Sequence, residues 1–471
     1  MPNSNGLYCE QLLLPTGWAQ DLVIIFDING VITEVRPKLI GDDFEKAAGP
    51  VLSGTPNTHS HAFQRAFVGL TQRRGPNGDD FWTWRQALYR FVSQLTPEDV
   101  EAIAAQLYVD MLKGGFTAVG EFHYLHHAAD GKAYDEPAEM SLRVAAAAQE
   151  CGIELTLLPV LYTQGGFGGV PIEPGQKRYA CNIDQFTRIV EGVEKASRAG
   201  VFYNVGIAPH SLRAVGLEAL NGAIQIIDGI GVERPIHIHI AEQLREVDEC
   251  VAWSGARPVE WLLANLNVDP LWCLVHATHI TKDEVVGLAS SGAVAGVCPT
   301  TEADLGDGIF PAVDYLGAGG RIGIGSDSHV IVDAVEELRL LEYGQRLTSL
   351  RRNLLASTEC CSTGTSLYLD AVEGGAQALG QDTKGINVGQ LANLVVLDGE
   401  APIFVGKSGV DITDTFVFSG NGRLIKDVFV RGRKVISEGK HPPPPPPPRR
   451  RRALPPAFVE RCAVFLKISR S

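Results

Sequence analysis

Two histidines separated by a single residue, His59 and His61, come shortly after the apolar run Val51–Gly54. Side chains at positions i and i+2 of a strand point to the same side, so the two imidazoles can converge on one point at a strand end. Converging imidazoles are suited to bind a divalent metal. A His-x-His pair alone is weak evidence, because two neighbouring histidines arise easily by chance. The metal hypothesis therefore depends on the residues that stand at the ends of the later apolar runs.

Residues able to bind a metal or carry a proton recur at the ends of four later apolar runs. They stand in Pro209-His210-Ser211-Leu212-Arg213, Ile236-His237-Ile238-His239-Ile240-Ala241-Glu242, Leu274-Val275-His276 and Gly325-Ser326-Asp327-Ser328. Each one alone has a plainer explanation, since a strand-end histidine is often only a hydrogen-bonded polar residue and Ser-Asp-Ser often caps a helix. Their repetition at successive strand ends predicts one shared site.

The ligand set follows from the coordination chemistry of zinc. A catalytic zinc ion has three or four nitrogen or oxygen ligands from the protein and keeps one position for water. We expect these ligands to be His59, His61, Asp327 and one histidine of the run over 236–242. His237 and His239 lie on the same face, so alternation does not choose between them. His239 is preferred because it lies nearer the strand end and three residues before Glu242.

Two further residues fit proton transfer. Glu242, beside the metal rather than bound to it, can protonate a leaving nitrogen, and His276 can accept a proton from water or stabilise developing charge. A divalent metal lowers the pKa of water toward about 7, which provides a nucleophile at neutral pH. Zinc is the expected ion, although Fe2+ or Mn2+ would tolerate similar ligands. With Asp327, these residues form the expected catalytic set.

The elements that must position this set alternate between strand and helix. Eight apolar, strand-like runs cover Val51–Gly54, Phe116–Phe122, Ile153–Leu161, Phe202–Ala208, Pro235–Ile240, Leu271–Val275, Ala293–Val297 and Arg321–Gly325. Helical spacing lies between them, as in Pro97–Lys113 after the expected N-cap Thr96, Ala138–Gln149 and Ile183–Ala199. This pattern predicts an α/β protein with a (β/α)8 TIM barrel, whose active site lies at the C-terminal ends of the strands.

Short strands return at both chain ends. They are expected at Tyr8–Leu14, Leu22–Phe26 and Val31–Val35, and again at Leu391–Leu397, Asp414–Phe418, Asp427–Val430 and Lys434–Ile436. Neither set is large enough for a stable sheet alone. We therefore predict one small β-sandwich domain from residues 1–50 and 385–440, flanking a catalytic barrel over 51–384.

Composition limits the class of partner. The chain has 471 residues, 45% of them hydrophobic, and a formal net charge of −14. Residues 441–471 carry seven basic residues and one acidic residue, so the remaining body has a net charge of −20. Such an acidic body argues against nucleic acid as a partner, and a small anionic substrate would need local arginines.

Nine scattered cysteines without a CxxC motif, no signal peptide and no long apolar run predict a reduced, cytoplasmic protein without membrane partners.

Two segments are interpreted more simply. The stretch Pro442–Pro448, followed by four arginines, is expected to be part of a disordered tail over 441–471, and the alternative is a polyproline ligand for a partner domain. The glycine-rich stretch Gly165–Gly169, within the loop 163–178, is equally consistent with a lid and with a plain flexible loop.

The order His-x-His, His-x-x-Glu, His, Asp resembles the mononuclear deaminase branch of the amidohydrolase superfamily. Longer stretches over residues 6–440 are similar to the family of formimidoylglutamate deiminases of bacterial histidine degradation: residues 59–66, 81–85, 238–243, 272–279, 301–311 and 323–329. Related barrels with two metals carry a bridging lysine after the fourth strand, which this chain lacks, so one metal ion is expected. The similarity also makes a homodimer the expected state.

The resemblance implies a reaction and a set of substrate ligands. The reaction converts N-formimino-L-glutamate and water to N-formyl-L-glutamate and ammonia. The substrate is expected to contact Gln64, Arg85, Tyr124, His210 and Arg213. Two carboxylates in an acidic protein call for arginines, which bind them in a bidentate manner. Arg85 is expected in a loop beside Trp82 and Trp84. The alternative to substrate binding is that Arg85 is a surface residue stacked on tryptophan.

Two other functions stay open at this point. A deaminase of the same branch acting on a purine, pyrimidine or related ring would use the same metal chemistry, although a base favours aromatic stacking over paired arginines. A non-catalytic barrel scaffold is the second alternative, and the complete set of metal ligands argues against it.

Overall fold

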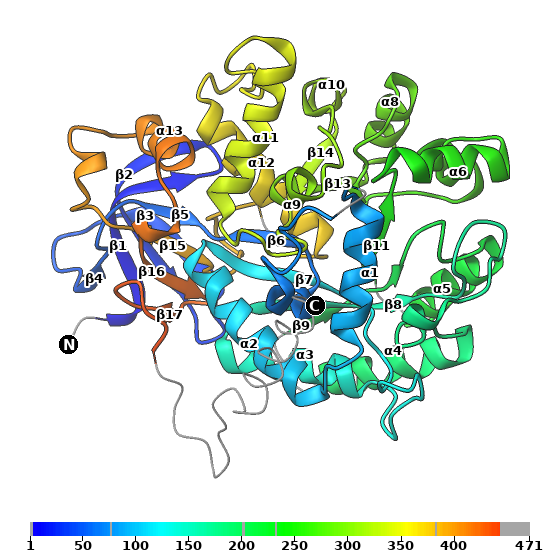
Figure 1. Ribbon diagram of the computed structural model, residues 1–471. Coiled ribbons are helices and arrows are strands. Elements are labelled where there is room, and N and C mark those ends of the chain that lie inside the picture. The colour runs from blue at the N-terminus through cyan, green and yellow to red at the C-terminus, as the bar shows by residue number, and fades with distance from the viewer. Residues whose placement is uncertain (1–2, 76–77, 200–202, 231–232, 382–383, 443–471) are drawn as a thin grey trace.

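The computed structural model describes residues 3–75, 78–199, 203–230, 233–381 and 384–442. The strands that carry the expected site residues lie in the centre of the molecule, and helices surround them (Figure 1). The sheet formed by the chain ends packs to one side. The predicted disordered tail lies outside the described residues, apart from His441 and Pro442.

Two parallel sheets form the central layer. The first has the order β10-β8-β7-β6, with β9 also paired to β8, and the second has the order β11-β12-β13-β14. Their bounds are β6 (Thr55–Ser60), β7 (Phe116–His123), β8 (Glu154–Leu161), β9 (Tyr203–Val205), β10 (Ala208–Pro209), β11 (Ile236–Ile240), β12 (Trp272–His276), β13 (Val294–Val297) and β14 (Arg321–Ile324). The side chains of β7, β8, β11 and β12 are buried throughout, as expected for strands covered on both faces.

The two sheets meet at both edges through isolated bridges. Ser60 bridges to Asp327 on one side, and Ile207 to Ile236 and Ser211 to His239 on the other. The predicted closed eight-stranded barrel is therefore not present as one continuous ladder in the described part of the chain. The bridges nevertheless bring the end of β6 next to the residues that follow β14, and both segments carry predicted metal ligands.

Helices connect the parallel strands, and the last two helices of this set follow β14. They are α1 (Phe81–Val92), α2 (Pro97–Lys113), α3 (Glu139–Cys151), α4 (Ile183–Arg198), α5 (Leu217–Asp228), α6 (Leu244–Ser254), α7 (Pro258–Asn265), α8 (Lys282–Ser291), α9 (Pro299–Leu305), α10 (Ala312–Gly317), α11 (Ala334–Ser349) and α12 (Thr363–Ala378). The predicted helix over Pro97–Lys113 has these bounds, and Thr96 and Asp99 form its capping box. Across the residues that the structure describes, no helix has both the length and the hydropathy needed to cross a membrane.

The chain ends form a single eight-stranded sheet in the order β17-β16-β15-β5-β1-β2-β3, with β4 paired to β1. Its strands are β1 (Asn3–Leu14), β2 (Gly17–Phe26), β3 (Ile32–Pro37), β4 (Phe44–Lys46), β5 (Val51–Ser53), β15 (Leu394–Leu397), β16 (Ile425–Val430) and β17 (Arg433–Ile436). Strands from the two ends thus pair directly, with β5 between β1 and β15. Among the described residues this is one mixed sheet, and a sandwich of two sheets is not seen.

Two expected elements differ from the structure, and the start of a third lies outside the described residues. The run Val51–Gly54 belongs to the chain-end sheet, and the central strand begins at Thr55. A Cβ on Gly54 would lie 2.2 Å from the Thr117 side chain, so the chain passes from one sheet to the other where only glycine fits. Asp414–Phe418 is not a strand but part of helix α13 (Val410–Ser419), which packs on α11 and α12. Phe202, the start of the fourth run, lies outside the described residues.

Candidate active site

Three histidine side chains meet at the C-terminal ends of β6 and β11. The Nε2 atoms of His59 and His61 are 3.1 Å apart, and those of His59 and His239 are 3.0 Å apart. Asp327 Oδ1 lies 3.3 Å from His61 Nε2 and 3.5 Å from His59 Nε2. Nitrogen ligands about 2.1 Å from a tetrahedral zinc ion would be separated by about 3.4 Å. The four predicted ligands thus converge as a metal site requires.

The hydrogen bonds of the Nδ1 atoms fix the tautomer of two of these imidazoles. His61 Nδ1 lies 2.8 Å from the carbonyl oxygen of Phe122, and His239 Nδ1 lies 3.0 Å from that of His210. A carbonyl oxygen only accepts, so each Nδ1 carries a proton and each Nε2 presents a lone pair. Histidine ligands of metals are oriented in this way. The donor set therefore fits a divalent cation.

Burial favours the neutral form of these histidines. It lowers the pKa of His59 and His239 well below the usual value, and it lowers the pKa of His61 to about 3. Neutral imidazole is the form that binds a metal. Burial also raises the pKa of Asp327 to about 7. A neighbouring divalent cation would have the opposite effect and favour the ionised carboxylate.

The choice between the two histidines of β11 has a clear geometric basis. His239 faces the other ligands, whereas Nε2 of His237 lies 2.7 Å from the carbonyl oxygen of Ala378, at the end of α12. Both side chains are buried, so burial does not distinguish them. They differ in what each side chain contacts: His239 meets His59, and His237 meets Ala378.

Two groups suited to proton transfer lie beside the predicted ligands. His276 Nε2 lies 3.8 Å from Glu242 Oε1 and 3.8 Å from Asp327 Oδ2. Its Nδ1 lies 3.2 Å from Glu302 Oε1, which orients the ring. Burial alone would lower the pKa of His276, but Glu242, Glu302 and Asp327 together raise it to about 10. The three carboxylates around His276 thus favour its protonated form.

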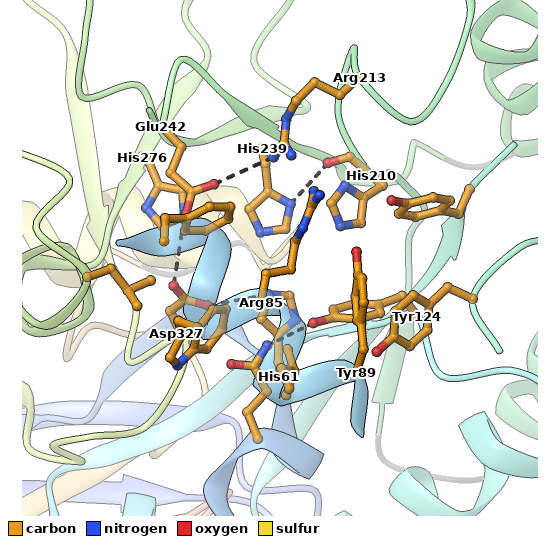
Figure 2. A pocket seen from close by; sticks show the side chains of 17 residues that line it. His61, Arg85, Tyr89, Tyr124, His210, Arg213, His239, Glu242, His276 and Asp327 are labelled. Atoms are coloured by element: carbon orange, nitrogen blue, oxygen red, sulfur yellow. Dashed lines mark hydrogen bonds and ion pairs between the residues drawn. The ribbon is translucent and has the colours of Figure 1, made fainter. Parts of the chain in front are cut away.

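Two arginines point into the same pocket (Figure 2). Arg213 follows β10, and its Nη2 and Nε lie 3.8 Å from Glu242 and 3.9 Å from Glu246, respectively. Arg85 lies on α1, not in the expected loop, because Asp80 and Thr83 form a capping box that starts the helix. Within the described ranges, the Arg85 side chain has no hydrogen bond or ion pair, and its Nε is buried. A partly buried guanidinium without a counter-ion is suited to bind an anion.

The remaining predicted substrate residues line this pocket as well. The Gln64 amide donates to the Tyr124 hydroxyl at 2.8 Å, and His210 lies edge-on to the Tyr124 ring. All the predicted site residues except His59 line the pocket, and His59 is fully buried behind its lining.

Several residues of the site are not predicted by the sequence patterns. Tyr89, Tyr162 and Tyr179 line the pocket, and Tyr162 directly follows β8, a position that strand-end reasoning could have found. Glu302 lies in one of the long stretches of the family resemblance but has no role assigned from it.

Left-handed backbone also marks the site, with φ of +67° at His276 and +42° at Asp327. Non-glycine residues adopt this conformation at a cost of about 1–2 kcal/mol, and such strain often accompanies function.

Comparison with known proteins decides the family. The model of the amidohydrolase family matches residues 51–435. This chain belongs to the amidohydrolase family. The family is metal-dependent, which agrees with the donor set of this amidohydrolase.

One curated relative shares almost half of its residues with this amidohydrolase. The formimidoylglutamate deiminase of Pseudomonas aeruginosa is 48% identical over 437 residues, which cover 93% of this chain and 96% of the relative. The 5-methylthioadenosine/S-adenosylhomocysteine deaminase of Natronomonas pharaonis is 27% identical over 91% of both chains. The resemblance found in the sequence motifs is confirmed, and it favours the deiminase over the ring deaminases.

Solved structures support the barrel-type hydrolase fold. An amidohydrolase from Brucella melitensis superposes with a TM-score of 0.90 at 43% identity, covering 99% of this chain and 100% of that one. An adenosine deaminase from Xanthomonas campestris with bound zinc gives a TM-score of 0.77 at 19% identity, covering 99% of this chain and 98% of that one, and shows the fold alone. The fold is that of a TIM-barrel metal hydrolase.

Proposed function

We propose that this amidohydrolase hydrolyses N-formimino-L-glutamate to N-formyl-L-glutamate and ammonia. The observation that carries the proposal is the convergence of Arg85 and Arg213 on the pocket that contains the predicted metal ligands. A substrate with two carboxylates and an amidine matches this pairing of cations and metal. The 48% identity to a formimidoylglutamate deiminase over nearly the whole length of both chains agrees with it.

The metal proposed for this site is one zinc ion, held by His59, His61, His239 and Asp327. Three neutral imidazoles and one carboxylate form a donor set that zinc accepts readily, although iron and manganese accept similar ligands. When bound, the metal would supply water activated at neutral pH. The protein residues then have to bind the substrate, orient it and move protons.

Glu242 is the residue proposed for proton transfer, and His276 is the residue proposed to stabilise developing charge. The Glu242 carboxylate lies between the Arg213 guanidinium and the His276 ring, at 3.8 Å from each. It can accept the proton that the attacking water loses and pass it to the amidine nitrogen, which then leaves as ammonia. His276, fixed by Glu302, can stabilise the negative charge that develops on the oxygen joined to the attacked carbon.

The two carboxylates of the substrate are proposed to pair with Arg85 and Arg213. Gln64, Tyr124 and His210 are proposed to complete the pocket, because they lie on its wall near the histidine ligands. Bidentate guanidinium pairing fixes orientation as well as charge. Such pairing would hold the formimino carbon near the metal ligands.

The test is a comparison of substrates with zinc-loaded enzyme. N-formimino-L-glutamate, N-formimino-L-aspartate and guanine are each incubated with the enzyme, and ammonia is measured. Release from formimino-amino acids alone supports the proposal. Release from guanine alone contradicts the substrate assignment while keeping the metal chemistry.

The domain division and the assembly are also proposals. We infer a catalytic unit that begins at Thr55 rather than at residue 51 and extends to residue 384, and a small β domain from 1–54 and 385–440, because β5 pairs with β1 and β15 in the chain-end sheet. A homodimer is inferred from the family resemblance. Light scattering after size-exclusion chromatography tests it, and a mass near 50.7 kDa, that of one chain, would contradict it.

A further inference from the structure

Three arginine side chains gather around the indole ring of Trp82. The guanidinium carbon lies 4.2 Å from the ring centroid for Arg245, 4.5 Å for Arg85 and 5.7 Å for Arg213. These residues come from three different places: Arg85 is three residues after Trp82 on α1, Arg213 follows β10, and Arg245 lies in the first turn of α6. One aromatic ring thus joins the helix over the pocket to two segments at the strand ends.

The charges in this group are unequally compensated. Arg245 pairs with Glu249 at 2.6 Å, and Arg213 faces Glu242 and Glu246. Arg85 has no acidic partner in the part of the chain that the structure describes, although it lies near two other cations. The face of an indole carries negative charge and attracts guanidinium groups, most strongly where water is excluded. Trp82 therefore offsets part of the repulsion between Arg85 and its cationic neighbours.

Trp82 itself does not line the pocket, whereas Arg85 and Arg213 do. Its effect on a ligand must pass through these arginines. A ring close to both guanidinium groups restricts their rotamers before the ligand arrives, which reduces the entropy lost on binding. Arginine side chains lose considerable rotamer freedom when they are fixed.

We propose that Trp82 is a positioning residue that preorganises Arg85 and Arg213 for the two carboxylates of a dicarboxylate ligand. Arg245, whose side chain is largely exposed, helps to fix the indole between α1 and α6. This inference rests on the proposed function for the identity of the substrate. Trp82 is then a residue that determines specificity although it lies outside the pocket wall. The ligand class that it favours is a dicarboxylate.

The test uses Trp82→Leu and Trp82→Phe in the full-length, zinc-loaded enzyme. Leucine keeps the residue apolar but has no aromatic face, whereas phenylalanine keeps a face. For Trp82→Leu we expect the KM for N-formimino-L-glutamate and the Kd for glutarate, measured by calorimetry, to rise about tenfold, as expected for loss of one or two partly buried cation–π contacts. We expect kcat to change by less than about threefold, and Trp82→Phe to recover most of the affinity.

Two controls separate this role from general damage to the fold. Trp18→Leu makes the same substitution in the chain-end sheet, where the indole is also partly buried, and is expected to leave the KM unchanged. Acetohydroxamate, a metal ligand without a carboxylate, should inhibit Trp82→Leu as well as wild type. Loss of glutarate affinity with unchanged acetohydroxamate inhibition supports the proposal.

Three results would overturn the inference. These are an unchanged Kd for glutarate in Trp82→Leu, an equal loss of affinity for glutarate and acetohydroxamate, and no recovery in Trp82→Phe. Failure of the wild-type enzyme to convert N-formimino-L-glutamate would count against the proposed function instead. Because glutarate binding is measured without turnover, the two failures are distinguishable.

Discussion

The Arg213 guanidinium faces the Glu242 carboxylate, with 3.8 Å between Nη2 and Oε2. The residue proposed to recognise the substrate thus borders the residue proposed to move the proton. Both are buried, so their interaction is only weakly screened by solvent. A ligand carboxylate that binds Arg213 would thereby lie beside the proposed catalytic group.

The first prediction concerns recognition. Arg213→Met keeps much of the side-chain volume and removes the charge, so we expect kcat/KM for N-formimino-L-glutamate to fall about 10- to 100-fold, with zinc content unchanged. Steady-state kinetics and elemental analysis measure the two quantities. Arg198→Met, on the exposed side of α4, is the matched control and should behave like wild type. An unchanged KM for Arg213→Met would remove this residue from carboxylate binding.

The second prediction concerns proton transfer. Glu242→Gln preserves shape but cannot carry a proton, so kcat should fall about 100- to 10,000-fold while zinc stays bound. Ammonia release under saturating substrate measures kcat, and elemental analysis measures zinc. A rate within a few-fold of wild type would show that another group moves the proton.

The third prediction uses the two neighbouring histidines of β11. His239→Ala should lose most of its zinc and its activity, because it removes one of the four proposed ligands. His237→Ala should keep zinc but unfold at a lower temperature, because it removes the contact with Ala378 and leaves a cavity. Zinc content and thermal unfolding are measured for both variants. The reverse pattern would mean that the wrong histidine has been assigned to the metal.

The fourth prediction concerns packing beneath the site. A Cβ on Gly374 of α12 would lie 1.9 Å from the carbonyl oxygen of Ile322 in β14, so Gly374→Ala should lower stability by about 1–3 kcal/mol despite the higher helix propensity of alanine. Gly317→Ala at the end of α10 meets no atom within 4 Å and should be neutral or slightly stabilising. The unfolding midpoints of both zinc-loaded variants test this. Equal midpoints would show that α12 can move away from β14 without loss.

Sequence reasoning indicates where the candidate ligands lie because strand ends are visible in the chain. His59, His61 and Asp327 come shortly after apolar runs, and parallel strands bring their ends to one edge. The choice of His239 needs a second argument, since period-2 alternation places His237 on the same face. Only the contact of His237 with Ala378, which is distant in sequence, accounts for the difference.

The errors arise where short apolar runs and local motifs are ambiguous. Residues 414–418 contain Thr, Phe and Val, which favour strands, yet packing against α11 and α12 makes them helical. The tryptophans beside Arg85 suggest an exposed loop, whereas the capping pair Asp80 and Thr83 starts a helix there. The run at Val51 ends at Gly54, where the chain changes sheets, and apolar character alone does not reveal such a change.

The reaction proposed for this enzyme is tested most directly by identifying its products with proton NMR. Wild-type enzyme with one equivalent of zinc is incubated with N-formimino-L-glutamate, and the formyl proton signal is compared with ammonia in the same sample. We predict N-formyl-L-glutamate and ammonia in equal amounts, because the tetrahedral carbon expels the terminal nitrogen. Formation of glutamate and formamide, or no turnover with zinc bound, would contradict the proposed reaction.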